Sequence, residues 1–259
     1  MQKIVVRDAP LAYASIGAPL ESAPLHFIWA HGWGQDHTVF VPVANSLARL
    51  GGHSLLDFPG FGQSPPPPAP WATEDYADAV ADWLKTLPRS RRIWIGHSFG
   101  CRVGLQLAAR HPDAIDGLFL VAAAGLPRTR TPLQKLKIKG RVAFYKSLKF
   151  LPRLGIDTSS LRSRFGSADY RNAGPMRATF VKVVQEDLTD AARHISCPVQ
   201  LVYGALDNET PPEIGHRLVK LIPNASISVL PRFDHYSVLS QGAHQIQNQL
   251  EKFVARVNP

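Results

Sequence analysis

The chain has 259 residues, of which 45% are hydrophobic and 19% charged, with a formal net charge of +9. This length accommodates one α/β domain with an insertion, and the composition is that of a soluble globular protein. No apolar run reaches the ~18 residues of a membrane span, and the first eight residues lack the long apolar core that is typical of a secretory signal. The two cysteines, Cys101 and Cys197, lack the spacing of zinc ligands and do not suggest a disulfide framework. A cytoplasmic protein is expected.

The positive charge is concentrated in one part of the chain. Residues 128–193 contain 15 Lys and Arg but only 5 Asp and Glu, a net charge of +10, while the remainder has a net charge of −1. This uneven distribution predicts a separate basic insertion in a nearly neutral body.

Short apolar runs alternate with helical patterns along the chain. The expected strands cover residues 2–6, 11–16, 25–30, 54–58, 93–95, 117–122, 199–203 and 227–230. Helices are expected at residues 39–50, from a Thr73 cap to about 87, from 99 to 111, at 213–221 and at 242–257. Most strands are apolar on both faces, which favours an α/β fold with a mostly parallel, eight-stranded sheet and helices on both faces.

The alternation breaks after residue 124. Residues 133–151 have the apolar spacing of a basic amphipathic helix, and residues 162–190 are expected to be partly helical. We therefore expect residues 1–124 and 196–259 to form the core domain. Residues 125–195 are expected to form an inserted helical cap, or lid, over the carboxyl edge of the sheet, where open α/β sheets place their sites.

The segment Gly96-His97-Ser98-Phe99-Gly100 fits the G-x-S-x-G pattern of a nucleophile elbow. It follows the apolar run 93–95 and opens a helical pattern, so Ser98 lies where a strand turns sharply into a helix. Such a turn strains the serine backbone and requires small neighbours, which the two glycines supply. The alternative is a glycine-containing turn with an ordinary surface serine.

Five motifs at strand ends together carry a family resemblance. They are His31-Gly32-Trp33-Gly34, the segment 57–64 (DFPGFGQS), Gly96-His97-Ser98-Phe99-Gly100, Gly204-Ala205-Leu206-Asp207 and Asp234-His235. Over essentially its full length the chain resembles the α/β-hydrolase fold family, in the capped branch of serine esterases, lipases and carbon–carbon hydrolases. It departs from the family at Asp234, because glycine commonly precedes the catalytic histidine.

The resemblance implies a catalytic triad of Ser98 as nucleophile, His235 as base and Asp207 as acid. Other histidines receive structural roles: His97 packs under the elbow and borders the pocket, His31 begins a glycine turn, and His244 lies on the last helix. Two carboxylates compete with Asp207 for the role of acid, namely Glu209 and Asp234.

The same resemblance implies an oxyanion hole made by the backbone N–H groups of Trp33 and Phe99. The side chains of Trp33, His97 and Phe99 are expected to shape the substrate pocket. The chemistry requires no metal and no cofactor. The serine nucleophile argues against the aspartate chemistry of haloalkane dehalogenases and epoxide hydrolases.

The favoured function is hydrolysis of carboxylic esters with small to medium acyl groups, with a small-molecule ester as the partner. Carbon–carbon bond hydrolysis of diketones and acyl transfer use the same triad, and a non-catalytic binding protein is a further alternative. The basic cap is interpreted first as a solvated charged face. It could also attract anionic substrates, or dock weakly on an acidic surface through Lys135, Lys137, Lys139, Arg141 and Lys146. No nucleic-acid module accompanies the charge, and the oligomeric state stays open.

Overall fold

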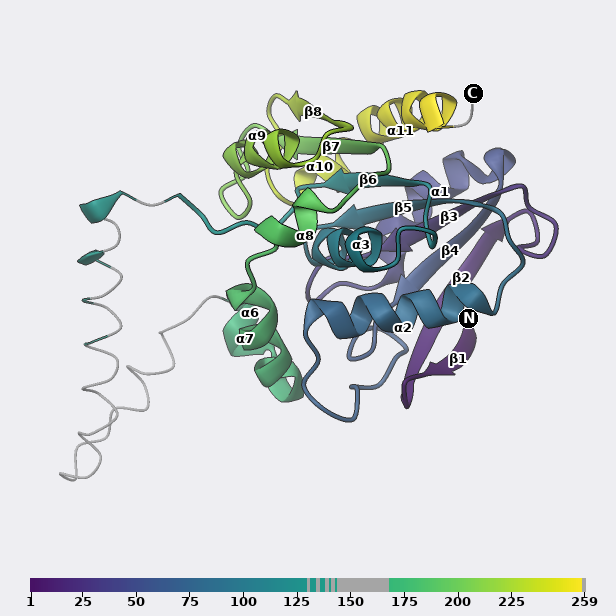
Figure 1. Cartoon of the computed structure of the whole chain (residues 1–259), viewed down its shortest axis with the longest axis horizontal. Helices are drawn as coiled ribbons and strands as arrows, with labels where there is room; N and C mark the ends of the chain where they lie inside the picture. Colours follow the sequence, from purple (N-terminus) through teal and green to yellow (C-terminus); the bar gives the residue numbers. More distant parts are fainter. Residues whose placement is uncertain (130, 134–135, 138–139, 141–142, 144–167, 258–259) are drawn as a thin grey trace.

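The computed structural model describes residues 1–129, 131–133, 136–137, 140, 143 and 168–257. Within these residues, eight strands form a single sheet (Figure 1). The strands are β1 (Gln2–Val6), β2 (Ala9–Gly17), β3 (Leu25–Ala30), β4 (Gly52–Asp57), β5 (Arg91–His97), β6 (Gly117–Val121), β7 (Val199–Gly204) and β8 (Ala225–Leu230). Every strand expected from the sequence is present, with ends that differ by at most two residues.

The sheet has the order β1-β2-β4-β3-β5-β6-β7-β8. Pairing is antiparallel between β1 and β2 and between β2 and β4, and it is parallel for all other neighbours. The expectation of a mostly parallel sheet is therefore confirmed. Because β3, β5, β6 and β7 run in the same direction, the loops after their carboxyl ends meet at one edge of the sheet.

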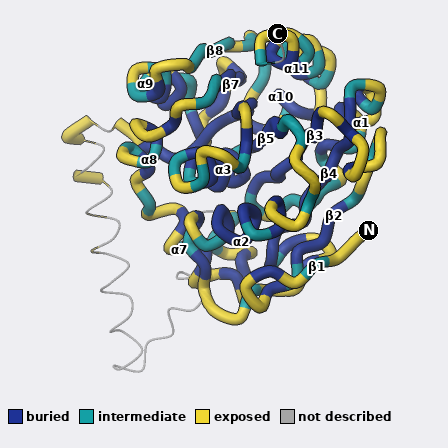
Figure 2. The backbone as a smooth tube through the Cα atoms, turned by 45° about the vertical axis from the view of Figure 1, so that its right-hand side comes forward, coloured by how far each residue is buried: buried dark blue, intermediate teal, exposed yellow. Residues whose placement is uncertain are grey.

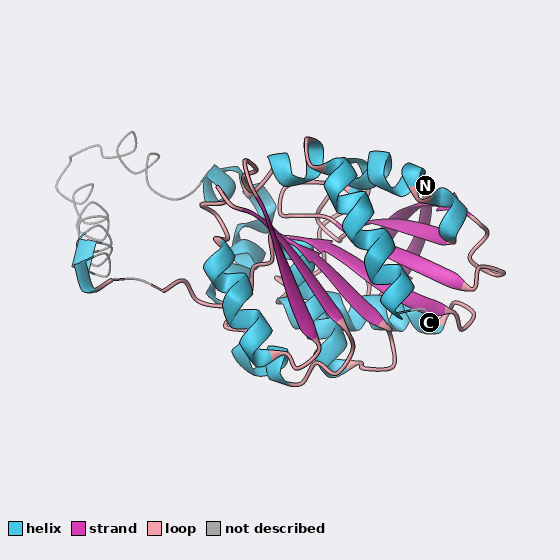
Figure 3. Ribbon diagram, turned by 90° about the horizontal axis from the view of Figure 1, so that it is seen from above, coloured by secondary structure: helices cyan, strands magenta, loops and turns pink. Residues whose placement is uncertain are grey.

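Helices cover both faces of this sheet (Figures 1 and 3). One face carries α2 (Thr73–Lys85), α3 (Phe99–Arg110), α8 (Thr189–Arg193) and α9 (Pro212–Leu221). The other face carries α1 (Val41–Ser46), α10 (Ser237–Ser240) and α11 (Ala243–Val257). Helices α6 (Ala168–Asn172) and α7 (Arg177–Gln185) lie beside α8, below it in Figure 1.

The central strands separate two apolar cores, because successive strand residues point to opposite faces. On β5, Trp94 belongs to the core beneath α2 and α3, whereas Ile93 and Ile95 belong to the core beneath α1 and α11. The sheet is accordingly buried along most of its length in Figure 2. Burial on both faces explains why these strands read as continuous apolar runs rather than as alternating ones.

Two local expectations are wrong. Residues 39–50 are not one helix: α1 lies between two short 3₁₀ turns, η1 (His37–Phe40) and η2 (Ala48–Leu50). Pro42 lies in the first turn of α1, where its missing N–H costs nothing, and Leu47 leaves the helical conformation at φ −106° and ψ 4°.

Thr73 is the first residue of α2 and not its cap. The capping position belongs to Ala72, whose N–H donates to the Asp75 carboxylate at 2.7 Å. Thr73 instead donates its N–H to Glu186 Oε1 at 2.8 Å and its hydroxyl to Glu186 Oε2. That partner lies 113 residues away in the sequence, so a local pattern could not indicate it.

The expected cap is described only in part. Residues 162–190 are helical over α6, η4 (Gly174–Met176), α7 and the start of α8, which agrees with the expectation for that segment. The helix expected at 133–151 lies almost entirely outside the described residues, as do most of the lysines and arginines proposed for surface docking. In the part of the chain that the structure describes, every helix is too short or too polar to cross a membrane.

Candidate active site

Ser98 lies in a strained turn between β5, which ends at His97, and α3, which begins at Phe99. Its backbone has φ 49° and ψ −100°, in the region that L-residues rarely adopt. A non-glycine residue held there costs about 1–3 kcal/mol, which the surrounding structure must offset. The turn is fixed by the Ser98 N–H, which donates to Val121 O at 3.1 Å, and by the Gly100 N–H, which donates to His31 O at 3.0 Å.

Both glycines of the motif are required by close packing. A Cβ at Gly100 would lie 2.0 Å from the carbonyl oxygen of Ala30, and a Cβ at Gly96 would lie 2.8 Å from the backbone nitrogen of Cys101. Either side chain would push α3 away from the sheet and change the direction of Ser98. The spacing of the motif is therefore a packing requirement of the turn.

His235 and Asp207 form a buried pair near the same edge. The two residues are 6% and 2% exposed, and Nδ1 of His235 lies 2.8 Å from Oδ2 of Asp207. Since a carboxylate only accepts, Nδ1–H donates and Nε2 is left as the basic nitrogen of the neutral ring. Burial raises the pKa of Asp207, but the hydrogen bond and charge of His235 and the donors of Thr210 outweigh it, so this pKa lies below its usual value.

Thr210 completes the surroundings of Asp207 and was not singled out in the sequence. Its N–H and that of Glu209 each donate to Asp207 Oδ1 at 2.8 Å. Its hydroxyl oxygen lies 2.9 Å from both Asp207 Oδ2 and Ala122 O. An aspartate whose side chain accepts from the backbone of the residues after it is typical of turns. The sequence could therefore indicate the turn at Asp207, but not the contact of Thr210 with Ala122, which directly follows β6.

The two competing carboxylates have other positions. Glu209 supplies its backbone N–H to Asp207. Asp234 is exposed, and its Oδ1 accepts from the N–H groups of Tyr236 and Ser237 at 3.0 and 2.8 Å, at the start of α10. Asp234 has no positive φ, so this loop does not need the glycine that is common in the family.

His97 lines the cavity but is only 1% exposed. Its Nε2 lies 2.9 Å from the carbonyl oxygen of His235, and its Nδ1 lies 3.0 Å from Oε1 of Gln35, which also accepts from Gly32 N–H. Burial and the neighbouring His235 lower the pKa of His97 to about 3, so the ring stays neutral. It connects the elbow to the backbone of His235, and the sequence gave no sign of the part played by Gln35.

His31 is fully buried and accepts from Phe58 N–H at 3.2 Å through Nε2. Burial lowers the pKa of His31 to about 4. The ring therefore joins the loop after β3 to the loop after β4, as the structural interpretation of His31 expected. His244 is an exposed residue of α11.

The backbone N–H groups of Trp33 and Phe99 are the two expected oxyanion donors. Phe99 is the first residue of α3, whose leading N–H groups have no partner inside the helix. Among the described residues, neither N–H is paired with an acceptor. Both residues line the cavity that Ser98 lines, and their rings lie 5.6 Å apart in an edge-to-face contact.

A cavity of about 400 Å³ joins these groups. Ser98, His235, Trp33, His97 and Phe99 all line it, together with Phe180 and Val183 of α7. Four charged side chains also border it, and none was singled out as part of the pocket from the sequence: Arg102, Arg128, Asp169 and Glu209. The cavity thus has an apolar wall and charged borders, and residues of α6 and α7 supply part of its lining.

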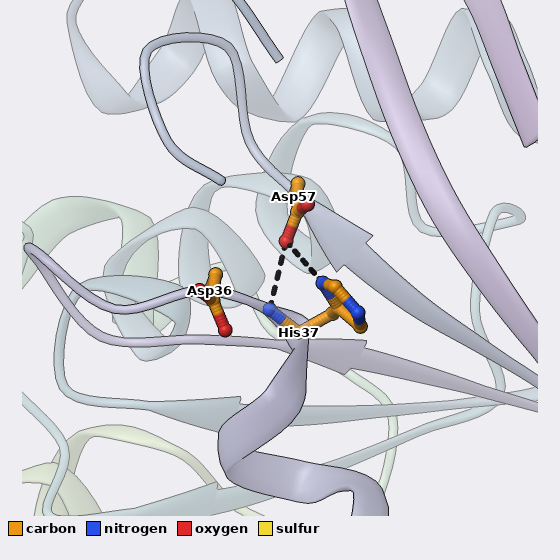
Figure 4. A group of neighbouring side chains, drawn as sticks. All are labelled: Asp36, His37 and Asp57. Atoms are coloured by element: carbon orange, nitrogen blue, oxygen red, sulfur yellow. Dashed lines mark hydrogen bonds and ion pairs between the residues drawn. The ribbon is translucent and has the colours of Figure 1, made fainter. Parts of the chain in front are cut away.

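A second polar group lies in the loops after β3 and β4 (Figure 4). Potential ligand atoms of Asp36, His37 and Asp57 lie within 4.8 Å of one another. However, Asp57 Oδ1 accepts from the His37 N–H at 2.7 Å and from Nδ1 at 2.9 Å, and Oδ2 accepts from Gln63 N–H at 2.9 Å. These donors already occupy both carboxylate oxygens, so the group is explained as a connection between two loops.

Comparison with known proteins agrees with this fold. Residues 26–154 match the sequence model of the α/β hydrolase fold. A pimeloyl-[acyl-carrier protein] methyl ester esterase of Chromobacterium violaceum is 31% identical over 232 residues, which cover 82% of this chain and 88% of the relative. An esterase of the same name from Vibrio cholerae is 25% identical over 245 residues, covering 88% and 94%.

Solved structures share the fold. A thermophilic esterase from Thermogutta terrifontis superimposes with a TM-score of 0.72 at 21% identity, over 100% of this chain and 99% of that one. The strand order, the elbow at Ser98 and the match to the Chromobacterium esterase point the same way. The chain belongs to the α/β-hydrolase fold family and is an ester hydrolase.

Proposed function

We propose that this chain is a serine carboxylesterase in which Ser98 is the nucleophile, His235 the general base and Asp207 the acid that orients the base. The observation that carries the proposal is that one cavity is lined both by Ser98, at a strained turn, and by His235, whose Nδ1 is held by the buried Asp207 carboxylate. A serine hydroxyl is too weak a nucleophile to attack an ester unaided, and a neutral imidazole nearby can take its proton.

The reaction follows from these roles. Ser98 Oγ attacks the acyl carbon while Nε2 of His235 takes its proton, and the negative oxygen is stabilised by the N–H groups of Trp33 and Phe99. The imidazolium donates its proton to the leaving alcohol, which leaves an acyl-serine. Water, deprotonated by His235, then hydrolyses the acyl-serine and restores the enzyme. Asp207 holds the tautomer of His235 and stabilises its positive form.

The cavity size limits the substrate. A volume of about 400 Å³ lies in the range of small-molecule sites and suits an acyl group of small to medium length. The aromatic and aliphatic wall of Phe99, Phe180 and Val183 suits a hydrocarbon chain. Methyl esters are the first leaving group to test, because the Chromobacterium and Vibrio relatives are named as methyl ester esterases.

The test is hydrolysis of p-nitrophenyl esters of graded chain length by wild type and by Ser98→Ala. We expect turnover of short and medium chains, and a loss of about three orders of magnitude or more in kcat for Ser98→Ala. Thr38→Ala, an exposed change at η1, serves as the control. Wild-type protein that is folded but neither hydrolyses any of these esters nor reacts with a fluorophosphonate at Ser98 would overturn the proposal.

A further inference from the structure

Arg102 brings an isolated cation to the candidate pocket. It lies one helical turn after Ser98 on α3 and lines the same cavity. The Cα–Cβ bonds of a helix tilt toward its N-terminus, so this side chain leaves the backbone in the direction of Ser98. Its hydrogen bond is from Nη1 to the backbone oxygen of Glu186 at 3.3 Å. Among the described residues, no carboxylate oxygen lies within the 4.0 Å of an ion pair with Arg102.

The nearest acid has a different partner. The carboxylate of Glu186 accepts from the N–H of Thr73 at 2.8 Å and from the Thr73 hydroxyl, at the N-terminus of α2. Glu186 therefore offers Arg102 its carbonyl oxygen and only a longer-range charge. The guanidinium retains donors that a planar anion could take in a bidentate manner.

The position of Arg102 is electrostatically unfavourable for a cation when no anion is bound beside it. It lies in the first turn of α3, where the helix dipole disfavours positive charge. Burial lowers the pKa of Arg102, although the charges of Glu186 and Asp187 oppose this effect. An anion bound in the cavity would offset both the helix dipole and the burial of the charge. Anion binding would therefore explain why a cation is placed here, which packing alone does not.

The other charged residues of the cavity determine which end of it an anionic group would occupy. Asp169 and Glu209 are the two acids on the His235 side of the cavity. Burial and the charge of Glu209 raise the pKa of Asp169, and His235 lowers it. Arg128 contacts the backbone oxygens of Asn208 and Glu209 on that side. Arg102 lies by Glu186, at the end of α7, whose Phe180 and Val183 form the apolar wall. Among the described residues, the His235 side thus carries two carboxylates against the single cation Arg128, which disfavours an anionic end there. Arg102, which has no paired carboxylate in the described part of the chain, attracts the anionic end along the apolar wall.

We propose that Arg102 binds a carboxylate at the far end of the acyl chain, so that the preferred substrates are half-esters of dicarboxylic acids. The inference rests on the proposed esterase function. The ester group lies at Ser98, the methylene chain packs on Phe180 and Val183, and the free carboxylate pairs with the guanidinium.

The experiment compares methyl half-esters of dicarboxylic acids, from succinate to suberate, with the corresponding dimethyl diesters. The two substrates of each length differ only in the charged end. For wild type we expect kcat/KM to favour the half-ester at the best chain length. In Arg102→Gln this preference falls by about 10- to 100-fold, the effect of losing a charge-assisted hydrogen bond. Arg102→Lys retains the charge without the planar fork, so we expect an intermediate preference.

Two further measurements make the outcomes distinct. Arg193→Gln removes an exposed cation of α8 and should leave the preference unchanged. Binding of the half-ester to Ser98→Ala, with and without Arg102→Gln, is measured by calorimetry and does not depend on turnover. A half-ester preference and affinity that survive Arg102→Gln would overturn the inference, while turnover of the diesters would still support the esterase. Arg102-dependent binding without any turnover would overturn the esterase proposal and retain the anion site.

Discussion

Two histidine–aspartate pairs in this protein have almost the same local geometry. His235 Nδ1 lies 2.8 Å from Asp207 Oδ2, and His37 Nδ1 lies 2.9 Å from Asp57 Oδ1. Both carboxylates are buried and both also accept backbone N–H groups. A search for the pair alone would find the two equally suitable as a base with its orienting acid.

The pairs differ in what surrounds them. Asp57 is the last residue of β4, and the loop that follows encloses its carboxylate, since a Cβ at Gly62 would lie 2.3 Å from it. The pair joins the end of β4 to the segment after β3 (Figure 4). His235 and Asp207 follow β8 and β7, and His235 lines the cavity that also contains Ser98. A histidine–aspartate pair therefore becomes a candidate base only where the topology brings a nucleophile into the same cavity.

The largest expected effect on kcat comes from replacing the aspartate of each pair by asparagine, and it should differ strongly between the two pairs. Asp207→Asn places an amide NH₂ where His235 Nδ1–H needs an acceptor, which favours the wrong tautomer, and kcat should fall by on the order of 10³- to 10⁴-fold. Asp57→Asn places the same group against the donors of His37 or Gln63, and should cost about 1–3 kcal/mol of stability with a much smaller change in kcat. Ester hydrolysis and urea denaturation of both variants measure the two effects.

The comparison would break if Asp57→Asn inactivated a stable protein as strongly as Asp207→Asn. That result would place the pair of the β3 and β4 loops in the reaction. Asp190→Asn provides a matched control, because it removes one carboxylate charge at an exposed position of α8 where Asp190 pairs with Arg193.

A second contrast concerns the histidines that stay neutral. Burial lowers the pKa values of His26 and His97 to about 3 and those of His31 and His53 to about 4. The unfolded chain binds these protons near pH 6.5 and the folded chain does not, so stability is lost as pH falls below about 6.5. The loss continues until the pH reaches the folded-state values. The expected loss is about 1 kcal/mol per histidine over the first pH unit, or several kcal/mol in total.

Urea denaturation between pH 7.5 and 5 measures this loss. His26→Gln should reduce the pH dependence by about one proton, and the exposed His194→Gln should leave it unchanged. A free energy of unfolding that is constant over this range would show that the buried rings take up protons without unfolding.

The smallest expected effect concerns Asp234, beside the proposed base. Asp234→Gly restores the residue that is common in the family and removes the acceptor of the Tyr236 and Ser237 N–H groups. Because Asp234 is exposed and has no positive φ, we expect kcat to change by no more than about threefold. Measured kcat values decide this. A loss approaching that of Asp207→Asn would mean that the cap of α10 holds the His235 ring in place.

Local sequence patterns were sufficient to predict the strands and the position of Ser98 at a strand-to-helix turn. Every strand was expected, because burial on both faces of a parallel sheet leaves a continuous apolar run in the sequence. The elbow at Ser98 was expected because glycine spacing records the close approach of α3 to Ala30. The prediction of one helix over residues 39–50 was wrong because the backbone leaves the helical conformation after α1, which has Pro42 in its first turn. The prediction for Thr73 was wrong because its partner, Glu186, is distant in the sequence.

Sequence order thus determined the fold, the family and which residues follow each strand. The tertiary structure alone decided the distant partners: Thr210 against Ala122, Gln35 against His97, and Arg102 against the backbone of Glu186. These contacts join segments that lie far apart in the chain, and only the assembled sheet with its helices brings them within hydrogen-bond distance. Side-chain partners at such separations follow from packing and leave no periodicity in the sequence.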